Sequence, residues 1–370
     1  MSDFYIVDQS ALADFCAGLR DAAWLALDTE FIREQTYYPQ LCLIQIAVPD
    51  QVACIDPLAL PSLDPLLDRL YDPALTKVLH AAHQDLELFF HLRGAVPTPI
   101  FDTQLAALVL GCGSQIGYAS LVQQLLGVDL AKAHTRADWR RRPLPAEWLA
   151  YAADDVRHLR DLYPKQLALL RERGWLESLD EDFRALADPN RYRVQPENAW
   201  QRVREHRRLR GAQRAVLQAL AAWREEQASE RDLPRRWILD DAALLELVRR
   251  MPESSDQLQR VRGLPAAIRQ QQGDALLARI ATARAAPPER WPTSPHRPQL
   301  ALTRPERTDE LLGLIAARAG ECGIEPRDIA DRRDVESLLA GEDCPLRHGW
   351  RAAVVGLELL GRLALDGNGA

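Results

Sequence analysis

The strongest constraint on the fold is a change in hydrophobic pattern near residue 190. Before that point, short apolar runs with the length and composition of strands alternate with stretches of helical apolar spacing. The strand-like runs are 23–27, 41–48, 52–55 and 77–80, and the helix-like stretches are 62–71, 84–93, 102–111, 118–126 and 146–173. After residue 190 only helical patterns continue. The sequence therefore predicts an α/β domain with a mixed sheet flanked by helices, followed by an all-helical part.

Prolines divide that helical part in two. Pro287 and Pro288, followed by Pro292, Pro295 and Pro298, repeatedly remove backbone donors and fix φ, which a packed helix does not tolerate. We interpret residues 286–299 as a linker. The predicted domains are thus 1–190, 195–285 and 300–370, the last two being small helical bundles.

The charge distribution favours a nucleic-acid enzyme more than the net charge of −7 suggests. Residues 1–130 contain 5 Lys and Arg against 16 Asp and Glu, whereas residues 131–236 contain 23 against 17. An acidic block that could hold cations beside a basic block that could hold phosphates is typical of a metal-dependent nuclease, although two solvated surfaces would give the same sums.

Targeting and redox features predict a cytoplasmic protein. The first residues include an acidic side chain at a position where a signal peptide needs positive charge. No uninterrupted apolar run approaches the roughly 18 residues of a membrane span. Six cysteines are scattered without the close pairs of a zinc site or the density of a disulfide scaffold. We expect them to be reduced, and we expect no membrane partner.

Three acid motifs suggest a catalytic site. Asp28 and Glu30 end an apolar strand, and alternation puts both side chains on one face, where they could ligate a hard divalent cation. Asp85 lies in the first turn of a helix, a position that the helix dipole alone would explain. Tyr151 and Asp155, at positions i and i+4 of a helix, share a face.

In their order along the chain these motifs resemble the Asp-Glu-Asp-Asp 3′–5′ exonuclease superfamily in its tyrosine-bearing branch, and within it the ribonuclease D family. The resemblance continues through residues 101–104, 117–121, 138–139 and 142–144. Residues from about 208 to 282 resemble the helicase-and-ribonuclease-D C-terminal (HRDC) module, and residues 300–370 resemble a divergent second copy. The resemblance implies a ribonuclease H-like sheet and removal of nucleotides from RNA 3′ ends.

The resemblance also implies roles for the acid residues. Asp28 would bridge two divalent ions, Mg²⁺ or Mn²⁺, while Glu30 and Asp155 complete the site that activates water and Asp85 holds the second ion. Two such ions can stabilise the attacking and leaving oxygens of phosphodiester cleavage. Tyr151 would position the nucleophilic water, because a free tyrosine pKa near 10 makes it a poor base.

Contacts to the nucleic acid are predicted from charge and aromatic character. They are Phe31, Gln45, Lys132, Arg136, Arg140, Arg141, Arg142, Arg207, Arg210 and Trp237. Phe31 and Gln45 could equally be packing residues, and a residue such as Trp237 is more often part of the core of a small bundle. Asp102, which precedes a helical start, is expected to cap that helix rather than to bind metal.

The tandem helical modules favour structured RNA with a single-stranded 3′ end, such as a tRNA precursor. A 3′–5′ DNA exonuclease is the nearest alternative, because contacts to the 2′-hydroxyl separate the two substrates. A catalytically silent RNA-binding scaffold is a second alternative, but a scaffold would not need all four acids and the tyrosine.

Overall fold

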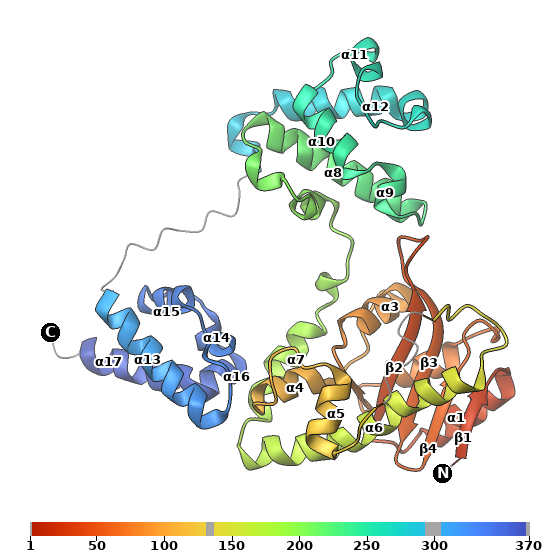
Figure 1. Cartoon of the computed structure of the whole chain (residues 1–370), viewed down its shortest axis with the longest axis vertical. Coiled ribbons are helices and arrows are strands. Elements are labelled where there is room, and N and C mark those ends of the chain that lie inside the picture. Colours follow the sequence, from red (N-terminus) through yellow and green to blue (C-terminus); the bar gives the residue numbers. More distant parts are fainter. Residues whose placement is uncertain (1, 131–136, 293–304, 368–370) are drawn as a thin grey trace. The chain divides into compact units, whose positions relative to one another are not determined.

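The structure, a computed structural model, describes residues 2–130, 137–292 and 305–367. The chain divides into two compact units, and the division does not follow chain order. The first unit contains residues 1–32, 41–192 and 299–370, and the second contains residues 33–40 and 193–298. Figure 1 shows the elements of each unit. The chain therefore passes between the units at four points, two of them inside one β-hairpin.

A six-stranded mixed sheet forms the centre of the first unit. Its order is β1-β4-β3-β2-β5-β6, with β1–β4, β2–β5 and β5–β6 parallel and β3–β4 antiparallel. The strands are β1 (Ser2–Ile6), β2 (Trp24–Ile32), β3 (Gln40–Val48), β4 (Gln51–Ile55), β5 (Thr76–Leu79) and β6 (Ile100–Asp102). The central strand β3 is buried from Leu41 to Ala47, as its continuous apolar run requires.

Helices flank this sheet. They are α1 (Gln9–Gly18), α2 (Asp64–Leu70), α3 (His83–Arg93), α4 (Thr103–Val109), α5 (Tyr118–Leu126), α6 (Ala146–Glu172) and α7 (Asp180–Leu186). The long helix α6 packs on β2, β4 and β5. The predicted α/β class with a mixed sheet and following helical bundles is confirmed, while β1, α1, β6 and α7 were not predicted. β1 and β6 are at most five residues long, too short to establish a period.

The C-terminal bundle shares the apolar core of the first unit. It consists of α13 (Pro305–Cys322), α14 (Pro326–Ile329), α15 (Arg332–Leu339), α16 (Gly349–Arg351) and α17 (Leu357–Gly367). The backbone N–H of Gly349 donates to Glu181, and Gly111, at φ 79°, lies so close to the bundle that a Cβ would stand 2.8 Å from the carbonyl oxygen of Gly323. We expected residues 300–370 to be a separate domain, but they pack with the sheet domain.

The second unit is a helical bundle with its own core, and it includes a loop from the N-terminal part of the chain. Its helices are α8 (Ala212–Glu230), α9 (Arg235–Ile238), α10 (Asp241–Arg250), α11 (Ser255–Gln259) and α12 (Ala266–Ala285). The loop is residues 33–40, the tip of the hairpin that joins β2 to β3, and Tyr37 at this tip is buried in the bundle core. Among the described helices, none is long and apolar enough to cross a membrane.

Candidate active site

Strand β2 brings the first acid pair to the edge of the core. Leu25, Ala26 and Leu27 are fully buried, whereas Asp28 and Glu30 are partly exposed, with buried Thr29 between them. Because successive strand residues point to opposite faces, the two carboxylates lie on one face. The buried half of the strand thus provides a rigid base for them.

Helix α3 supplies the third carboxylate. Asp85 lies in its first turn, where the helix dipole stabilises a negative charge, and its side chain is only 7% exposed. The hydroxyl of Thr29 donates a 2.5 Å hydrogen bond to Asp85 Oδ1. Thr29, which lies between Asp28 and Glu30 in β2, therefore ties the third acid to the strand that carries the first two.

Helix α6 supplies the fourth carboxylate and a tyrosine. The hydroxyl of Tyr151 donates to the carboxylate of Asp155 one turn later, as the predicted shared face requires. The hydroxyl of Tyr118, on α5, donates to the backbone carbonyl of Asp155. Asp155 is thus fixed through both its side chain and its backbone.

The four acids act on one another electrostatically. Burial and the charges of Asp28, Asp155 and Asp85 raise the pKa of Glu30 to about 9. Burial and the charge of Asp155 raise the pKa of Asp28, and burial and the charge of Asp28 raise the pKa of Asp85. Each ionised carboxylate makes ionisation of the others less favourable. A cluster of this kind favours a bound cation.

The donor set fits a hard divalent cation. Mg²⁺ and Mn²⁺ prefer carboxylate oxygens, and the cluster offers four of them. No lysine or arginine charge contributes to the raised pKa values of these four carboxylates. Within the described ranges, no group of three His, Cys, Asp or Glu side chains is already arranged to hold an ion.

Tyr151 is suited to donate a hydrogen bond rather than to accept a proton from water. Burial and the charges of Asp155 and Glu30 raise its pKa well above the ordinary value near 10. It therefore keeps its proton at neutral pH. Sequence reasoning did not assign Thr29 or Tyr118 to the site, although Tyr118 belongs to a motif of the resemblance.

The predicted nucleic-acid contacts in the first unit differ in their surroundings. Phe31 is partly buried against the core. Gln45 is fully buried, and neither its amide nitrogen nor its oxygen has a hydrogen-bond partner within the described residues. The expected contact of Gln45 with a terminal base was therefore wrong, because this side chain lies inside the fold. The continuous apolar run around Gln45, which buries both faces of β3, is the signal that could have indicated this position. Lys132 and Arg136 lie outside the described residues.

The three consecutive arginines 140–142 are not equivalent. Arg141 is exposed, and Arg140 is paired with Asp138. Arg142 instead holds the carboxylate of Asp56, which is 1% exposed, at 2.5 and 2.7 Å, and also donates to the backbone carbonyl of Cys42. The expected contact of Arg142 with a phosphate was therefore wrong, because the N–H groups of its guanidinium already donate to Asp56 and Cys42.

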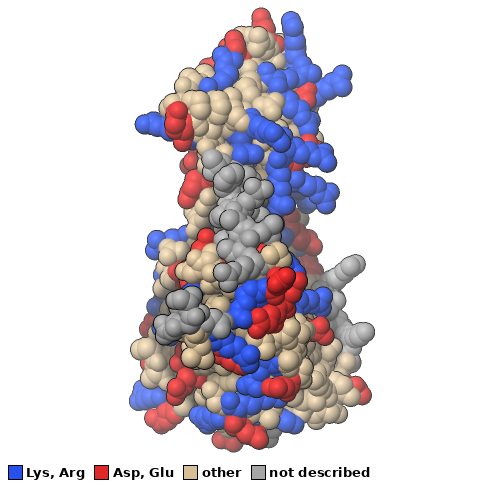
Figure 2. Space-filling model, turned by 90° about the vertical axis from the view of Figure 1, so that its left-hand side faces the viewer, with Lys and Arg blue, Asp and Glu red and all other residues tan. Residues whose placement is uncertain are grey.

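In the second unit the predicted contacts lie at the surface. Arg207 and Arg210 are exposed, and Trp237 is 51% exposed, so it is not a core residue of the bundle. Figure 2 shows Lys and Arg side chains gathered on one side of this helical bundle, in the upper part of the view. A basic surface therefore lies on this bundle, and contact of Arg207, Arg210 and Trp237 with nucleic acid stays a prediction.

Comparisons with known proteins agree with this architecture. A family described as 3′-5′ exonuclease matches residues 4–170, and the HRDC domain family matches residues 213–280. Ribonuclease D from Sphingobium indicum is 40% identical over 98% of this chain and 93% of its own length. Ribonuclease D from Gluconacetobacter diazotrophicus is 41% identical over 95% of this chain and 91% of its own length.

A solved structure extends the similarity to the whole fold. The crystal structure of Escherichia coli RNase D, described as an exoribonuclease involved in structured RNA processing, matches with a TM-score of 0.81 and 34% identity, covering 99% of each chain. Full-length similarity at this level confirms the predicted 3′–5′ exonuclease and its HRDC domain. The chain belongs to the ribonuclease D family.

Proposed function

We propose that this chain is a metal-dependent exoribonuclease that trims single-stranded 3′ tails of structured RNA, with precursors of tRNA as its substrates. The observation that carries the proposal is the cluster of four carboxylates, each with a raised pKa, beside a tyrosine that keeps its proton. The predicted RNA 3′ end as substrate agrees with the family to which the chain belongs.

The proposed roles of the acids are those that the family resemblance implies. Asp28 would contact both of two divalent ions, Glu30 and Asp155 would share the ion next to the attacking water, and Asp85 would hold the other ion through water. Two Mg²⁺ or Mn²⁺ ions would supply Lewis-acid stabilisation of the attacking and leaving oxygens. The Thr29 hydroxyl would keep Asp85 oriented toward the site.

Tyr151 would position the attacking water. Its hydroxyl proton is donated to Asp155 in a hydrogen bond, so its oxygen can accept a hydrogen bond from a water beside that carboxylate. Because its pKa is raised, Tyr151 would not remove the proton of the water itself. Proton removal would fall to a carboxylate of the cluster.

Two alternatives are less well supported. A 3′–5′ DNA exonuclease would use the same acids, but the relatives with full-length similarity are named ribonuclease D. A catalytically silent RNA-binding scaffold would not require four acids and a tyrosine on three separate elements to meet. We also propose a cytoplasmic location, because all six cysteines are free thiols, as a reducing compartment would keep them.

The proposal is tested with RNA and DNA of one sequence, each labelled at the 5′ end, each carrying a duplex and a single-stranded 3′ overhang. With Mg²⁺, the RNA should give a ladder that shortens from the 3′ end and stops near the duplex. The chelator EDTA should abolish the ladder. Equal degradation of DNA would favour the first alternative, and an intact RNA in the presence of metal would favour the second.

A second substrate pair tests the tRNA part of the proposal. A tRNA-shaped RNA with a short 3′ extension is compared with an unstructured RNA that ends in the same extension. The extension on the tRNA should be removed to a defined end, whereas the unstructured RNA should be degraded throughout. Identical products from both would contradict a role in tRNA maturation.

A further inference from the structure

A turn of three residues joins strand β5 to helix α3, the helix that carries Asp85. Residues 80–82 form the whole connection, so the chain changes from strand to helix within them. Ala81 has φ 55°, a left-handed conformation that costs a residue with a Cβ atom about 1–2 kcal/mol. The N-cap of α3 is Ala82, whose methyl group cannot accept a hydrogen bond. The turn therefore depends on contacts from another part of the chain.

Asp102 supplies these contacts from the neighbouring strand. It is the last residue of β6, and the parallel register of β5 and β6 places it beside Leu79, the last residue of β5. Its Oδ1 accepts a 3.2 Å hydrogen bond from the backbone N–H of Ala81, and its Oδ2 accepts one of 2.9 Å from that of Ala82. A carboxylate 20 residues further along the chain thus holds the turn that leads into α3.

The same carboxylate caps α4, but capping does not explain both of its oxygens. Oδ1 accepts from the backbone N–H groups of Gln104 and Leu105 at 2.8 and 3.3 Å. A helix cap needs one acceptor oxygen, which a serine or threonine hydroxyl also supplies. Oδ2 accepts from Ala82 and from neither of these two residues of α4. Asp102, which is 4% exposed, is thus a buried acceptor shared between the starts of two helices.

Asp85 takes its position from this turn. It lies three residues after Ala82, in the first turn of α3, and the backbone N–H of Leu86 donates to the Ala82 carbonyl at 2.9 Å. A shift of the turn would therefore move the backbone of Asp85 with it. The carboxylate of Asp85 is held separately, by the hydroxyl of Thr29 at 2.5 Å. Asp102 and Thr29 thus fix the backbone and the carboxylate of the same acid.

We propose that Asp102 is a positioning residue for Asp85, acting through the backbone of residues 81 and 82. Both oxygens of Asp102 already accept from backbone N–H groups, so this residue supports the acid cluster without being a further ligand. The inference rests on the proposed function, because it takes Asp85 to hold a catalytic metal ion. It gives Asp102 a second role beside the capping of α4 that the sequence predicts.

The substitution Asp102→Ser separates the two roles of this carboxylate. The serine hydroxyl can still cap α4, but a single oxygen on a shorter side chain cannot also reach the N–H groups of Ala81 and Ala82. The matched control is Asp8→Ser, because Asp8 is the N-cap of α1 and its side chain accepts from Ala11 of that helix. If Asp102 were only a helix cap, the two serine variants would behave alike in metal binding and in catalysis.

Metal binding without RNA is the first readout. Binding of Mn²⁺ alone to the full chain is followed by electron paramagnetic resonance of the free ion. Asp102→Ser should raise the dissociation constant of one bound Mn²⁺ about tenfold, because a group that orients a ligand is lost, and Asp8→Ser should leave this constant unchanged. Asp102→Asn keeps Oδ1 but places an amide nitrogen where Oδ2 was, so it should weaken Mn²⁺ binding to an intermediate extent. Asparagine is also a good N-cap, and this variant carries the test if the serine variant does not fold.

Cleavage of 5′-labelled RNA is the second readout. The Mg²⁺ concentration that gives half of the maximal rate should rise about tenfold in Asp102→Ser, whereas KM for the RNA at saturating Mg²⁺ should stay unchanged. If Asp102→Ser and Asp102→Asn bind Mn²⁺ as tightly as the unaltered chain, or if Asp8→Ser is equally weakened, the positioning role is refuted. If Asp85→Asn binds Mn²⁺ and cleaves RNA as the unaltered chain does, the proposed function fails instead.

Discussion

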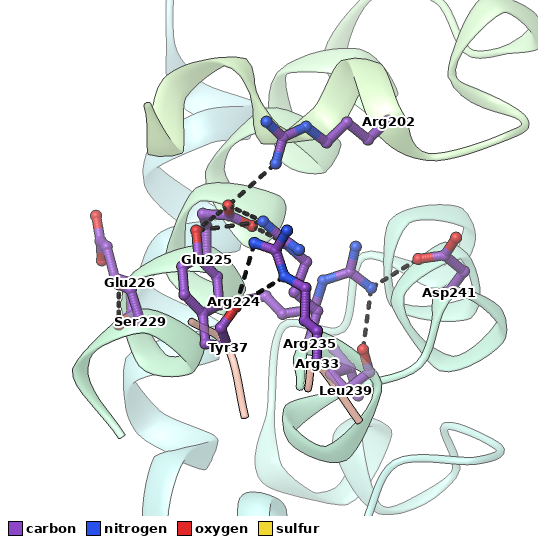
Figure 3. Close-up of polar contacts among 10 residues, drawn as sticks. All are labelled: Arg33, Tyr37, Arg202, Arg224, Glu225, Glu226, Ser229, Arg235, Leu239 and Asp241. Carbon is purple, nitrogen blue, oxygen red and sulfur yellow. Dashed lines mark hydrogen bonds and ion pairs between the residues drawn. The ribbon is translucent and has the colours of Figure 1, made fainter. Parts of the chain in front are cut away.

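Replacing Glu225 by alanine should detach the hairpin tip from the helical bundle. The carboxylate is nearly fully buried and accepts from Tyr37 and Arg235, with Arg202 at 3.3 Å (Figure 3). Removing one partner of a buried ion pair costs about 3–5 kcal/mol, because the other charge is left unpaired. The Arg235 side chain is 35% exposed and regains some hydration, so we expect a loss near the lower limit, about 3 kcal/mol.

Hydrogen exchange followed by mass spectrometry measures this loss segment by segment. The opening free energy should fall together in peptides from α8 and from residues 33–40, while peptides from β4 stay unchanged. Glu226→Ala is the matched control, because Glu226 is the next residue of α8 and forms a 3.4 Å surface pair with Arg279, worth about 0.5 kcal/mol. Rapid exchange of the tip in the unaltered chain would show that the Glu225 network does not hold the tip on the bundle.

The same network predicts how tip protection depends on pH. Burial raises the pKa of Glu225, but hydrogen bonds from Arg235 and Tyr37 lower it more, so the net shift is downward. A carboxyl whose pKa is lower in the folded state stabilises that state above the unfolded value of about 4.3, and the contribution is lost as the pH falls below it. The protection of the tip amides against hydrogen exchange should be constant from pH 7 to 5 and should decline below about pH 4.3. In the Glu225→Gln variant this decline should be absent.

The other predictions concern single residues of the first unit. Arg142→Ala should lower the stability of the sheet domain by about 3 kcal/mol, measured by urea unfolding, because it leaves Asp56 buried and unpaired. Arg141→Ala should leave stability within about 0.5 kcal/mol, and the reverse order would contradict the structural role of Arg142. Gln45→Met should not destabilise the domain, because the buried amide has no partner within the described residues, and a loss of several kcal/mol would reveal a missed hydrogen bond. Tyr151→Phe should slow RNA cleavage about 100-fold in single-turnover assays without weakening RNA binding, and unchanged cleavage would exclude a positioning role.

Local patterns predicted the parts of the site that depend on local geometry. Strand alternation correctly placed Asp28 and Glu30 on one face, and helical spacing correctly placed Tyr151 next to Asp155. Asp102 caps α4 as expected, accepting from the backbone N–H groups of the next helical residues. These features follow from residue spacing within one element.

Contacts between distant segments were not predictable in the same way. Arg142 stands in a basic run, but its partner Asp56 is 86 residues away, and nothing in the run distinguishes it from exposed Arg141. Tyr37 and Glu225 are 188 residues apart, so periodicity could not show that the hairpin tip belongs to the helical bundle. Such pairs are set by the topology of the fold rather than by local propensity.

Anomalous diffraction from crystals soaked with Mn²⁺ and a nucleoside monophosphate tests the central claim most directly. We expect two peaks about 3.5–4 Å apart at the acid cluster, both in contact with Asp28, with one also contacting Glu30 and Asp155. The same soak of the Asp28→Asn variant should lose at least one peak. An absence of peaks at these four carboxylates, or a single peak elsewhere in a crystal of active enzyme, would show that the four acids do not hold the catalytic metal ions.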